Sequence, residues 1–289
     1  MKKKTIALLG ITLMLIVIFA LNYNPVINKK ILKADNTKLI NNGIIPINVS
    51  VTNCFLLRID NKYILIDTVY EHEWDIFNNA LKKANVDIMD ISHILLTHHH
   101  DDHIGLLNKL TTLNNDIIVV MSELAKDSIL KGENDRNHDG GFVNKWVRFI
   151  KVINNKFNKN FNELKFTPYV ARENDILITD DVRLTEIGID LDGIIIKTPG
   201  HTKDSISIVL DNGYAFVGDA AANMPIFQLV GANYFVLVLE DIDTYYNSWN
   251  KIISSKAKYI FPSHGNSFLV EKLSENMWKN KKENIVSNK

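Results

Sequence analysis

The sequence predicts an α/β fold for most of the chain. Strand signals and helix signals alternate from about residue 44 to the C-terminal region. The length of 289 residues suits one large domain or two small ones, and it is enough to bury a sizeable core. With 46% hydrophobic and 23% charged residues, the composition is that of a globular protein, which excludes a disordered tail or a collagen-like fibre.

The charge balance indicates which kind of partner to expect, and the cysteine content bears on the cellular compartment. The chain has 33 basic and 33 acidic residues, so its formal net charge is zero. A neutral chain has no excess positive charge to attract a phosphate backbone, so we expect a small-molecule substrate and no nucleic-acid partner. The single cysteine, Cys54, cannot form an internal disulfide, so the compartment cannot be inferred from disulfides. The composition leaves the oligomeric state open.

The N-terminal segment has the pattern of a membrane-targeting helix. Three lysines at positions 2–4 precede an uninterrupted apolar run over residues 5–21. At about 1.5 Å per residue this run covers roughly 25 Å of helix, a little short of the bilayer core of about 30 Å. We therefore predict a retained signal-anchor over residues 1–21, with a cleaved signal peptide and secretion as the alternative. The lysines favour the cytoplasmic side, which predicts a cell-membrane protein with a single-pass anchor and an extracytoplasmic domain.

The folded part is expected to start after a polar linker. Residues 22–43 are rich in Asn and Lys and predict that linker, and residues 44–289 then form the domain. The first elements are strands over 53–59 and 63–67, which flank the turn residues 60–62 and predict a hairpin.

Helical periodicity follows over residues 73–84, where Trp74, Phe77 and Leu81 share one face. A short apolar strand over 93–97 then leads into a run of histidines. The later elements predicted, in order, are a strand at 116–121, a helix at 123–131, strands at 182–188, 194–198, 205–210 and 214–218, a helix at 241–256, a strand at 259–261 and a terminal helix at 269–283.

Between these elements, residues 133–166 are polar and rich in Gly and Asn. Four aromatic residues are interleaved in this segment, namely Trp146, Phe149, Phe157 and Phe161. Two interpretations stay open: an inserted lid with an apolar lining, or a helical excursion that packs its rings on the core.

The segment 98–103 carries the strongest chemical signal. Four histidines and two aspartates occur within it, directly after an apolar strand. Buried in a core they would need partners for many polar atoms, and a solvated histidine-rich loop is the alternative. Imidazole and carboxylate groups are ligands of a zinc-type cation, so metal binding is favoured. In an extended strand end, His98 and His100 point the same way towards one ion, and Asp102 and His103 follow on the next turn.

This pattern, His-x-His-x-Asp-His, resembles the signature of the metallo-β-lactamase-fold superfamily. The spelling fits in one register only, which uses His98, His100, Asp102 and His103 and leaves His99 and Asp101 as non-ligands. Further matches occur in the family's order, namely Ile64–Thr68, Thr198–Thr202, Val217–Asp219 and Pro262–Gly265. The resemblance extends over about residues 44–270.

The resemblance implies a fold and a set of ligands. The implied fold is a four-layer αββα sandwich, with two mixed β-sheets packed face to face and helices outside. The implied cofactor is a pair of divalent metal ions, for which we expect Zn²⁺. By position in the motifs, His98, His100 and His201 would hold the first ion, Asp102, His103 and His264 the second, Asp219 would bridge both, and Asp67 would orient a histidine ligand.

The activity implied is hydrolysis. A hydroxide that bridges two cations would attack an ester, lactone or related carbonyl of a small molecule, and Asp102 would orient it or relay its proton. β-Lactam, thioester and phosphodiester bonds stay open as substrates. The metallo-β-lactamases usually lack an equivalent of Asp219, glyoxalase II adds a helical C-terminal domain, and the related lactonases carry a tyrosine where this chain has Ala222.

Two functions from other classes are kept as alternatives. One is a mononuclear iron enzyme that resembles the persulfide dioxygenases, in which only two histidines and one aspartate bind metal. The other is a non-catalytic metal-binding protein. The seven predicted ligand positions favour two metal ions. The metal count per chain distinguishes the mononuclear enzyme, and absence of turnover on any ester, lactone or phosphodiester despite full metal occupancy would support the non-catalytic protein.

Overall fold

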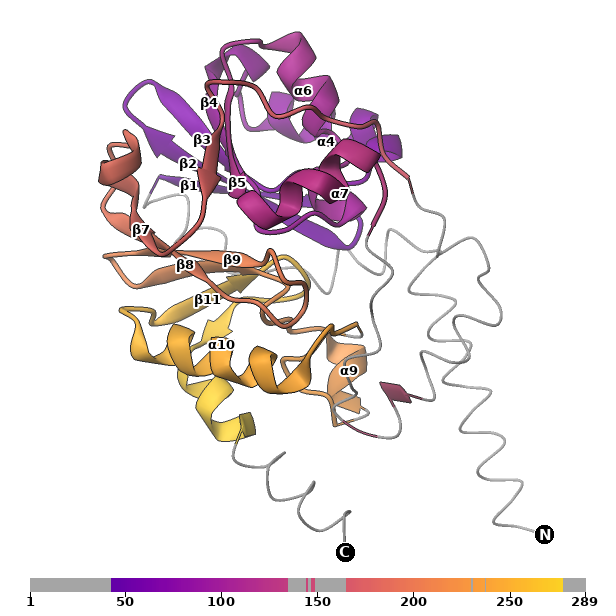
Figure 1. Ribbon diagram of the computed structural model, residues 1–289, viewed down its shortest axis with the longest axis vertical. Coiled ribbons are helices and arrows are strands. Elements are labelled where there is room, and N and C mark those ends of the chain that lie inside the picture. The colour runs from indigo at the N-terminus through magenta and orange to yellow at the C-terminus, as the bar shows by residue number, and fades with distance from the viewer. Residues whose placement is uncertain are drawn as a thin grey trace, which may run out of the picture.

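The computed structural model describes residues 43–134, 144, 147–148, 165–229, 231–236 and 238–277. These residues form two six-stranded β-sheets that lie face to face, and helices cover the outer side of each sheet (Figure 1). The predicted four-layer αββα sandwich is therefore confirmed.

The first sheet contains the N-terminal strands in sequence order. Its strands are β1 (Ile44–Val49), β2 (Thr52–Ile59), β3 (Lys62–Ile66), β4 (Ile91–Leu95), β5 (Ile118–Ser122) and β6 (Ile176–Ile178). β1, β2 and β3 pair antiparallel, whereas β3, β4, β5 and β6 pair parallel. The parallel strands put their C-terminal ends at one edge of the sheet.

The second sheet contains the C-terminal strands, and here too each strand lies beside its neighbours in the sequence. Its strands are β7 (Val182–Arg183), β8 (Gly193–Lys197), β9 (Ile206–Leu210), β10 (Tyr214–Gly218), β11 (Tyr259–Pro262) and β12 (Phe268–Leu269). β10 and β11 pair parallel and the other neighbours pair antiparallel. Both sheets are therefore mixed.

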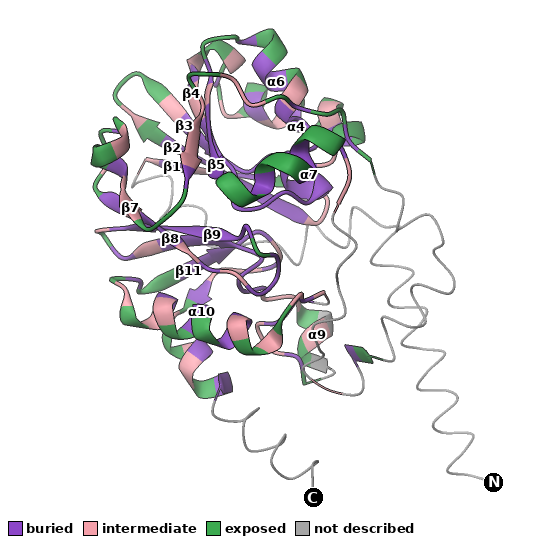
Figure 2. Cartoon of the chain, viewed as in Figure 1, coloured by how far each residue is buried: buried purple, intermediate pink, exposed green. Residues whose placement is uncertain are grey.

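The helices lie outside the sheets. They are α4 (Trp74–Lys83), α5 (Asp101–Ile104), α6 (Leu107–Leu113), α7 (Lys126–Lys131), α9 (Pro225–Leu229) and α10 (Ile242–Ser254). Short 3₁₀ turns occur at η1 (Glu71–Glu73), η2 (Ile88–Asp90), η3 (Glu123–Ala125) and η5 (Leu184–Ile187). α4, α6 and α7 cover the first sheet and α10 covers the second (Figure 1), and these helices combine buried and exposed residues (Figure 2).

Three apolar clusters correspond to the three contacts between the four layers. The cluster between the two sheets contains Phe55 from β2, which contacts Phe216 of β10 with ring centroids 4.9 Å apart. A second cluster packs Phe77 and Leu81 of α4 against the first sheet. The third packs Trp249 of α10 against the second sheet. Each sheet therefore buries apolar side chains on both of its faces, against the other sheet and against its covering helices.

Most predicted elements are present with small changes of boundary. The hairpin corresponds to β2 and β3, the first helix to α4, and the later helix to α10. The strand predicted over 182–188 is wrong beyond residue 183, where the chain turns into η5. The side chain of Glu186 accepts from the Arg183 backbone N–H and Gly188 adopts a left-handed φ of 81°, and both favour a helical turn over an extended strand. Of the terminal helix, residues 271–277 are described as helical.

The predictions that depended on a membrane helix are corrected. In the described ranges, no helix has the length and apolar character needed to cross a bilayer. This finding overturns the transmembrane anchor and the cell-membrane location that followed from it. The segment 1–21, the linker 22–42 and most of 133–166, with its four aromatic residues, lie outside the described residues.

Candidate metal centre

The predicted ligands come together where strands from both sheets end. β4 ends at Leu95 and the histidine-rich segment follows it, with α5 starting at Asp101. In the second sheet, His201 follows β8, Asp219 follows β10 and His264 follows β11. A strand end fixes the backbone from which a side chain projects, so loops of this kind hold ligands in a defined arrangement.

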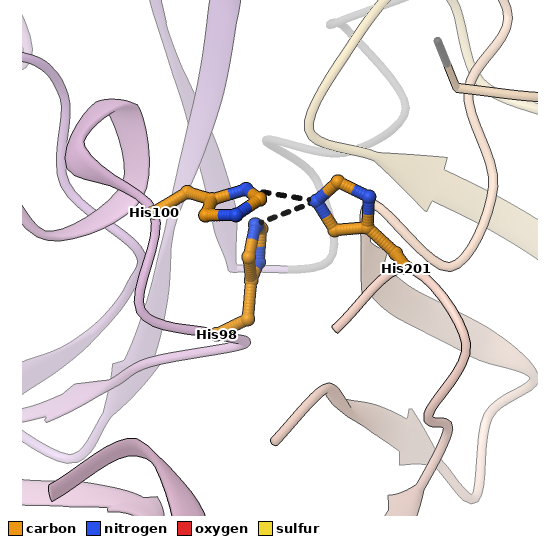
Figure 3. A group of neighbouring side chains, drawn as sticks. All are labelled: His98, His100 and His201. Atoms are coloured by element: carbon orange, nitrogen blue, oxygen red, sulfur yellow. Dashed lines mark hydrogen bonds between the residues drawn. The ribbon is translucent and has the colours of Figure 1, made fainter. Parts of the chain in front are cut away.

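Three imidazoles form the first group, which we call the three-histidine group: His98, His100 and His201. The Nε2 atom of His201 lies 3.2 Å from Nε2 of His98 and 2.9 Å from Nδ1 of His100. Figure 3 shows His98 and His100 projecting from one loop and His201 meeting them from the opposite side. All three side chains are buried. Nitrogen ligands of a tetrahedral zinc ion, at about 2.0–2.1 Å each, lie about 3.3 Å apart, so this spacing fits a shared ion.

The second group, which we call the acidic group, consists of Asp102, His103 and His264. The Nε2 atom of His264 lies 3.1 Å from Oδ2 of Asp102, and Nε2 of His103 lies 3.6 Å from Oδ1 of the same carboxylate. The hydroxyl of Thr52 donates to Asp102 Oδ2 at 3.4 Å. Candidate ligand atoms of this group all lie within 4.8 Å of one another.

Asp219 lies between the two groups and faces each with a different oxygen. Its Oδ2 atom is 3.4 Å from Nε2 of His201 in the three-histidine group. Its Oδ1 atom is 3.3 Å from Nε2 of His264 and 3.7 Å from Nε2 of His103 in the acidic group. This arrangement is the one that a carboxylate shared between two cations requires.

The outer nitrogen of each of three histidines is held by a fixed partner. Nδ1 of His201 donates to the carbonyl of Val238 at 2.7 Å, and Nδ1 of His264 donates to the carbonyl of Val51 at 2.9 Å. Because a carbonyl oxygen can only accept, the neutral imidazole keeps its proton on Nδ1 and presents the lone pair of Nε2 to the centre. Nδ1 of His103 is bound at 2.9 Å by a carboxylate, that of Asp67.

The carboxylate of Asp67 connects the acidic group to the residues around it through hydrogen bonds. Its Oδ1 atom accepts from the backbone N–H of Thr97 at 2.7 Å. Its Oδ2 atom accepts from the Thr97 hydroxyl at 2.7 Å, from His103 Nδ1 at 2.9 Å and from the Ser263 hydroxyl at 3.1 Å. Asp67 has a left-handed φ of 57°, and these four hydrogen bonds hold it in that unfavourable conformation.

The two groups differ in their proton affinity. Burial and the neighbouring imidazoles lower the pKa of His98, and burial also lowers the pKa of His201 although Asp219 opposes it. In the acidic group, burial lowers the pKa of the two histidines, but the neighbouring carboxylates raise it by more. Asp102 and Asp67 raise the pKa of His103 to about 10, and Asp219 and Asp102 raise the pKa of His264 to about 9.

The pKa of Asp102 changes in the opposite direction. Burial favours its neutral form, but His103 and His264 outweigh that effect and hold its pKa below the usual range. The metal-free acidic group is therefore a set of paired charges, in which protons occupy positions that a cation would take.

Two buried atoms test whether a cation fits. His103 Nε2 and Asp219 Oδ1 make no hydrogen bond to any described residue, although both are inaccessible to solvent. Buried polar atoms normally have a partner, and a cation between these two atoms would supply one. Imidazole nitrogens with carboxylate oxygens are a donor set for divalent ions such as zinc. The clusters are thus suited to divalent metal binding.

The histidine-rich segment also contains side chains that turn away from the centre. His99 contacts Asp204, and Asp101 exchanges hydrogen bonds with Asn134, whose Oδ1 accepts from the Asp101 backbone N–H at 2.9 Å. Of the histidines without a motif, His72 is exposed and His93 is half-buried beside Ser92.

Sequence reasoning missed several residues that support the centre. Thr97 and Ser263 both donate to Asp67, and Asp204 binds the histidine-rich segment from the other half of the molecule. The only available signal was position: Thr97 and Ser263 directly precede predicted ligands. Their shared partner follows from the packing of the two sheets.

Comparison with known proteins agrees with this architecture. A model of the metallo-β-lactamase superfamily matches residues 47–264. Beta-lactamase-like protein 2 homologs from Drosophila melanogaster and Caenorhabditis elegans are 27% and 26% identical over 74% and 83% of this chain. The matches cover 59% and 65% of those two proteins, so the chain spans less than two thirds of the length of these curated relatives.

Solved structures share the fold at low sequence identity. An archaeal metallo-β-lactamase superfamily protein from Sulfolobus tokodaii has a TM-score of 0.54 at 18% identity, with 82% of this chain and 85% of that chain covered. A metallo-β-lactamase with a HARLDQ motif from Cronobacter sakazakii has a TM-score of 0.52 at 17% identity, with 77% and 75% covered. The family model extends over most of the residues that build both sheets and all the predicted ligands, and the chain belongs to the metallo-β-lactamase superfamily.

Proposed function

We propose that this protein is a dinuclear metal-dependent hydrolase that cleaves an ester or lactone bond in a small molecule. The observation that carries the proposal is the position of Asp219, whose two oxygens face the three-histidine group and the acidic group separately. A carboxylate in this position offsets the repulsion between two cations, whereas a single-metal site would need only one of its two oxygens.

Each group is proposed to hold one divalent ion. The residues assigned are His98, His100 and His201 for the first ion, Asp102, His103 and His264 for the second, and Asp219 for both. We expect Zn²⁺, because the donors are imidazole nitrogens and carboxylate oxygens. Bound divalent ions would lower the pKa of water from about 15.7 towards 7 and would polarise a substrate carbonyl.

The remaining roles belong to side chains of the chain itself. We propose that the Asp102 carboxylate orients the attacking water and holds its proton, since it is the least buried of the acidic side chains in the centre. Contacts to His264 and Thr52 hold that carboxylate in place. Asp67 acts through His103, because it holds Nδ1 and so keeps Nε2 directed at the centre.

The substrate class rests on two residues and on charge. The presence of Asp219 argues against a β-lactam substrate, since the metallo-β-lactamases usually lack this residue. The neutral chain disfavours a nucleic-acid substrate. The related lactonases carry a tyrosine where this chain has Ala222. The Ala222 side chain is buried, and its backbone N–H donates to the backbone carbonyl of Tyr234. A hydrogen-bond donor to the oxyanion that forms during hydrolysis must therefore come from another residue.

Elemental analysis with a substrate panel tests the proposal. We expect about two equivalents of metal per chain by the shared-carboxylate argument. We also expect faster hydrolysis of lactones and esters than of thioesters, β-lactams or phosphodiesters. One iron per chain with oxygen consumption would instead indicate a mononuclear oxygenase. Two bound metals without turnover on any of these substrates would indicate a non-catalytic metal-binding protein.

A further inference from the structure

His99 and Asp204 form a buried pair beside the three-histidine group. The Nδ1 atom of His99 lies 2.8 Å from Oδ1 of Asp204, and the backbone N–H of His99 donates to Oδ2 of the same carboxylate at 2.9 Å. Both oxygens of Asp204 are therefore used by one residue. The relative exposure is 0% for His99 and 1% for Asp204, so water cannot replace either bond.

His99 lies between two predicted metal ligands in the sequence, so its position affects both of them. His99 stands between His98 and His100, whose ring nitrogens both approach His201. Successive side chains of an extended segment point to opposite sides, so a residue between two inward side chains points outward. Asp204 binds both the backbone N–H and the ring of His99, and this fixes the direction in which the His98 and His100 side chains project.

The pair also joins the two halves of the molecule. His99 follows β4 of the first sheet, whereas Asp204 lies three residues after His201, on the loop between β8 and β9 of the second sheet. A third hydrogen bond lies directly after that loop, from the backbone N–H of Ile206, the first residue of β9, to the carbonyl of Thr97 at 2.8 Å. The loop that carries His201 is thereby held at a fixed distance from the loop that carries His98 and His100.

Burying a carboxylate requires strong compensation. An ionised carboxylate without hydrogen bonds costs several kcal/mol to bury, whereas charge-assisted bonds offset that cost. The bonds from His99 hold the pKa of Asp204 low although burial opposes them. A buried ion of this kind does not maximise stability, because an apolar pair of similar size often gives an equal or greater free energy of unfolding. What it adds is a defined geometry.

We infer that Asp204 and His99 are a positioning pair, which keeps His98 and His100 in register with His201 so that the three nitrogens bind one divalent cation. This inference rests on the proposed function, because it takes the three-histidine group as a metal site. Neither residue is assigned a contact with metal or substrate. Their effect is expected on the affinity and geometry of the three-histidine group.

The test uses Co²⁺ as the probe and His264→Ala as the parent. This parent lacks one of the three side chains of the acidic group, so the first equivalent of Co²⁺ is expected at the three-histidine group, where its visible absorption spectrum and competition with a chelator report on it. Asp204→Ala removes both hydrogen bonds of the pair, whereas His99→Leu removes the ring bond and leaves the backbone N–H of residue 99 bound to Asp204. Each is expected to weaken Co²⁺ binding by about tenfold, the lower end of the loss caused by changing residues that support metal ligands, and to change the spectrum.

Conservative variants separate positioning from general destabilisation. His99→Asn places an amide donor near the position of Nδ1 and should restore affinity and spectrum towards those of the parent. Asp204→Asn keeps the side-chain volume and one acceptor, so it provides a folded variant should Asp204→Ala not fold, and it should weaken binding less than Asp204→Ala does. The double variant His99→Leu/Asp204→Ala should bind no more weakly than Asp204→Ala alone, because Asp204→Ala already removes both hydrogen bonds of the pair.

Asp175→Ala is the matched control. Asp175 is also a buried carboxylate, and it accepts from the backbone N–H of Val119 at 3.0 Å and from the hydroxyl of Tyr169 at 2.6 Å. It contacts β5 near the N-terminal end of that strand, away from the strand ends that carry the centre. Its loss should lower the unfolding temperature and leave Co²⁺ affinity and spectrum unchanged.

The outcomes are distinguishable. Weakened binding in Asp204→Ala and His99→Leu, with recovery in His99→Asn, supports the positioning pair. Unchanged affinity and spectrum in those two variants, with only a lower unfolding temperature, overturns it. If the unmodified protein and the parent both fail to bind Co²⁺, the proposed function fails first and the inference fails with it.

Discussion

The three-histidine group and the acidic group lie beside each other, yet they hold protons in opposite ways. The first is made of imidazoles alone, and burial lowers the pKa of His98 and His201. The second surrounds two imidazoles with carboxylates, which raise the pKa of His103 to about 10 and that of His264 to about 9. Near neutral pH, His98 and His201 of the metal-free protein are thus neutral and present nitrogen lone pairs, whereas His103 and His264 are protonated.

This difference shows that similar ligands do not make similar sites. A cation that enters the three-histidine group meets neutral nitrogen donors, whereas one that enters the acidic group must displace protons. The carboxylates that hold those protons also attract the cation. Asp219 belongs to both groups, and four predictions test how far the groups can be separated.

The largest effect is expected for Asp219→Ala, which removes the carboxylate shared by both groups. The variant should lose at least one equivalent of metal, and its hydrolytic rate should fall by about 100-fold or more, since even the loss of a partner that only supports a ligand costs 10–100-fold. Elemental analysis and steady-state rates measure both quantities. Two metals retained at full rate would remove the basis for a bridging role.

Asp67→Asn should separate the groups. The amide nitrogen of the variant would take the place of Oδ2, which now accepts from His103, Thr97 and Ser263. A donor facing Nδ1 of His103 favours the tautomer with the proton on Nε2, which removes the lone pair that points to the centre.

We therefore expect the affinity of the acidic group to fall by about 10–100-fold, with a much smaller change at the three-histidine group. Stepwise Co²⁺ titration measures both. Ser263→Ala is the control, because it removes one donor from Asp67 and leaves the bond to His103 in place. An equal loss at both groups would contradict the separation.

The metal-free protein should become less stable in alkaline solution. A histidine in an unfolded chain has a pKa of about 6.5, and the folded pKa of His103 and His264 is higher. A raised pKa contributes stability that is fully present below about pH 6.5 and is lost as the pH rises through the folded values of about 9 and 10.

The unfolding temperature of the metal-free protein should therefore decrease between about pH 6.5 and pH 10, by the linkage between protonation and folding. His103→Gln should show a weaker decrease. The metal-loaded protein should not show this decrease, because the cation has replaced the protons. A flat profile for the metal-free protein would mean that the carboxylates do not hold these protons.

The smallest effect is expected for Tyr245→Phe. The buried hydroxyl of Tyr245 donates to the backbone carbonyl of Asp219 at 3.0 Å, outside both ligand groups. Its loss should lower the free energy of unfolding by about 1 kcal/mol, the usual net value of one hydrogen bond. Urea unfolding measures this change. Because Asp219 serves both groups, any loss of Co²⁺ affinity should be shared between them, and a loss at one group only would contradict this arrangement.

The sequence identified some of these features and not others. The alternation of strands and helices and the hairpin over β2 and β3 were predictable, since their signals are local. The brief strand β12 and the helix α5 were not predicted, because a strand of two residues and a helix of four carry too little periodicity. The strand expected over 182–188 stops early, where a glycine and a side-chain cap outweigh the apolar pattern.

By itself, the sequence indicated the candidate ligands of the centre. The spacing of His98, His100, Asp102 and His103 is local, so it indicated metal binding before any fold was known. The meeting of His201, Asp219 and His264 with that segment was decided by the order of strands in two packed sheets. The pairing of His99 with Asp204, 105 positions apart in the chain, arises in the same way. The pKa differences between the groups were also decided by the tertiary structure, because they depend on burial and on the carboxylates that the packing places beside each histidine.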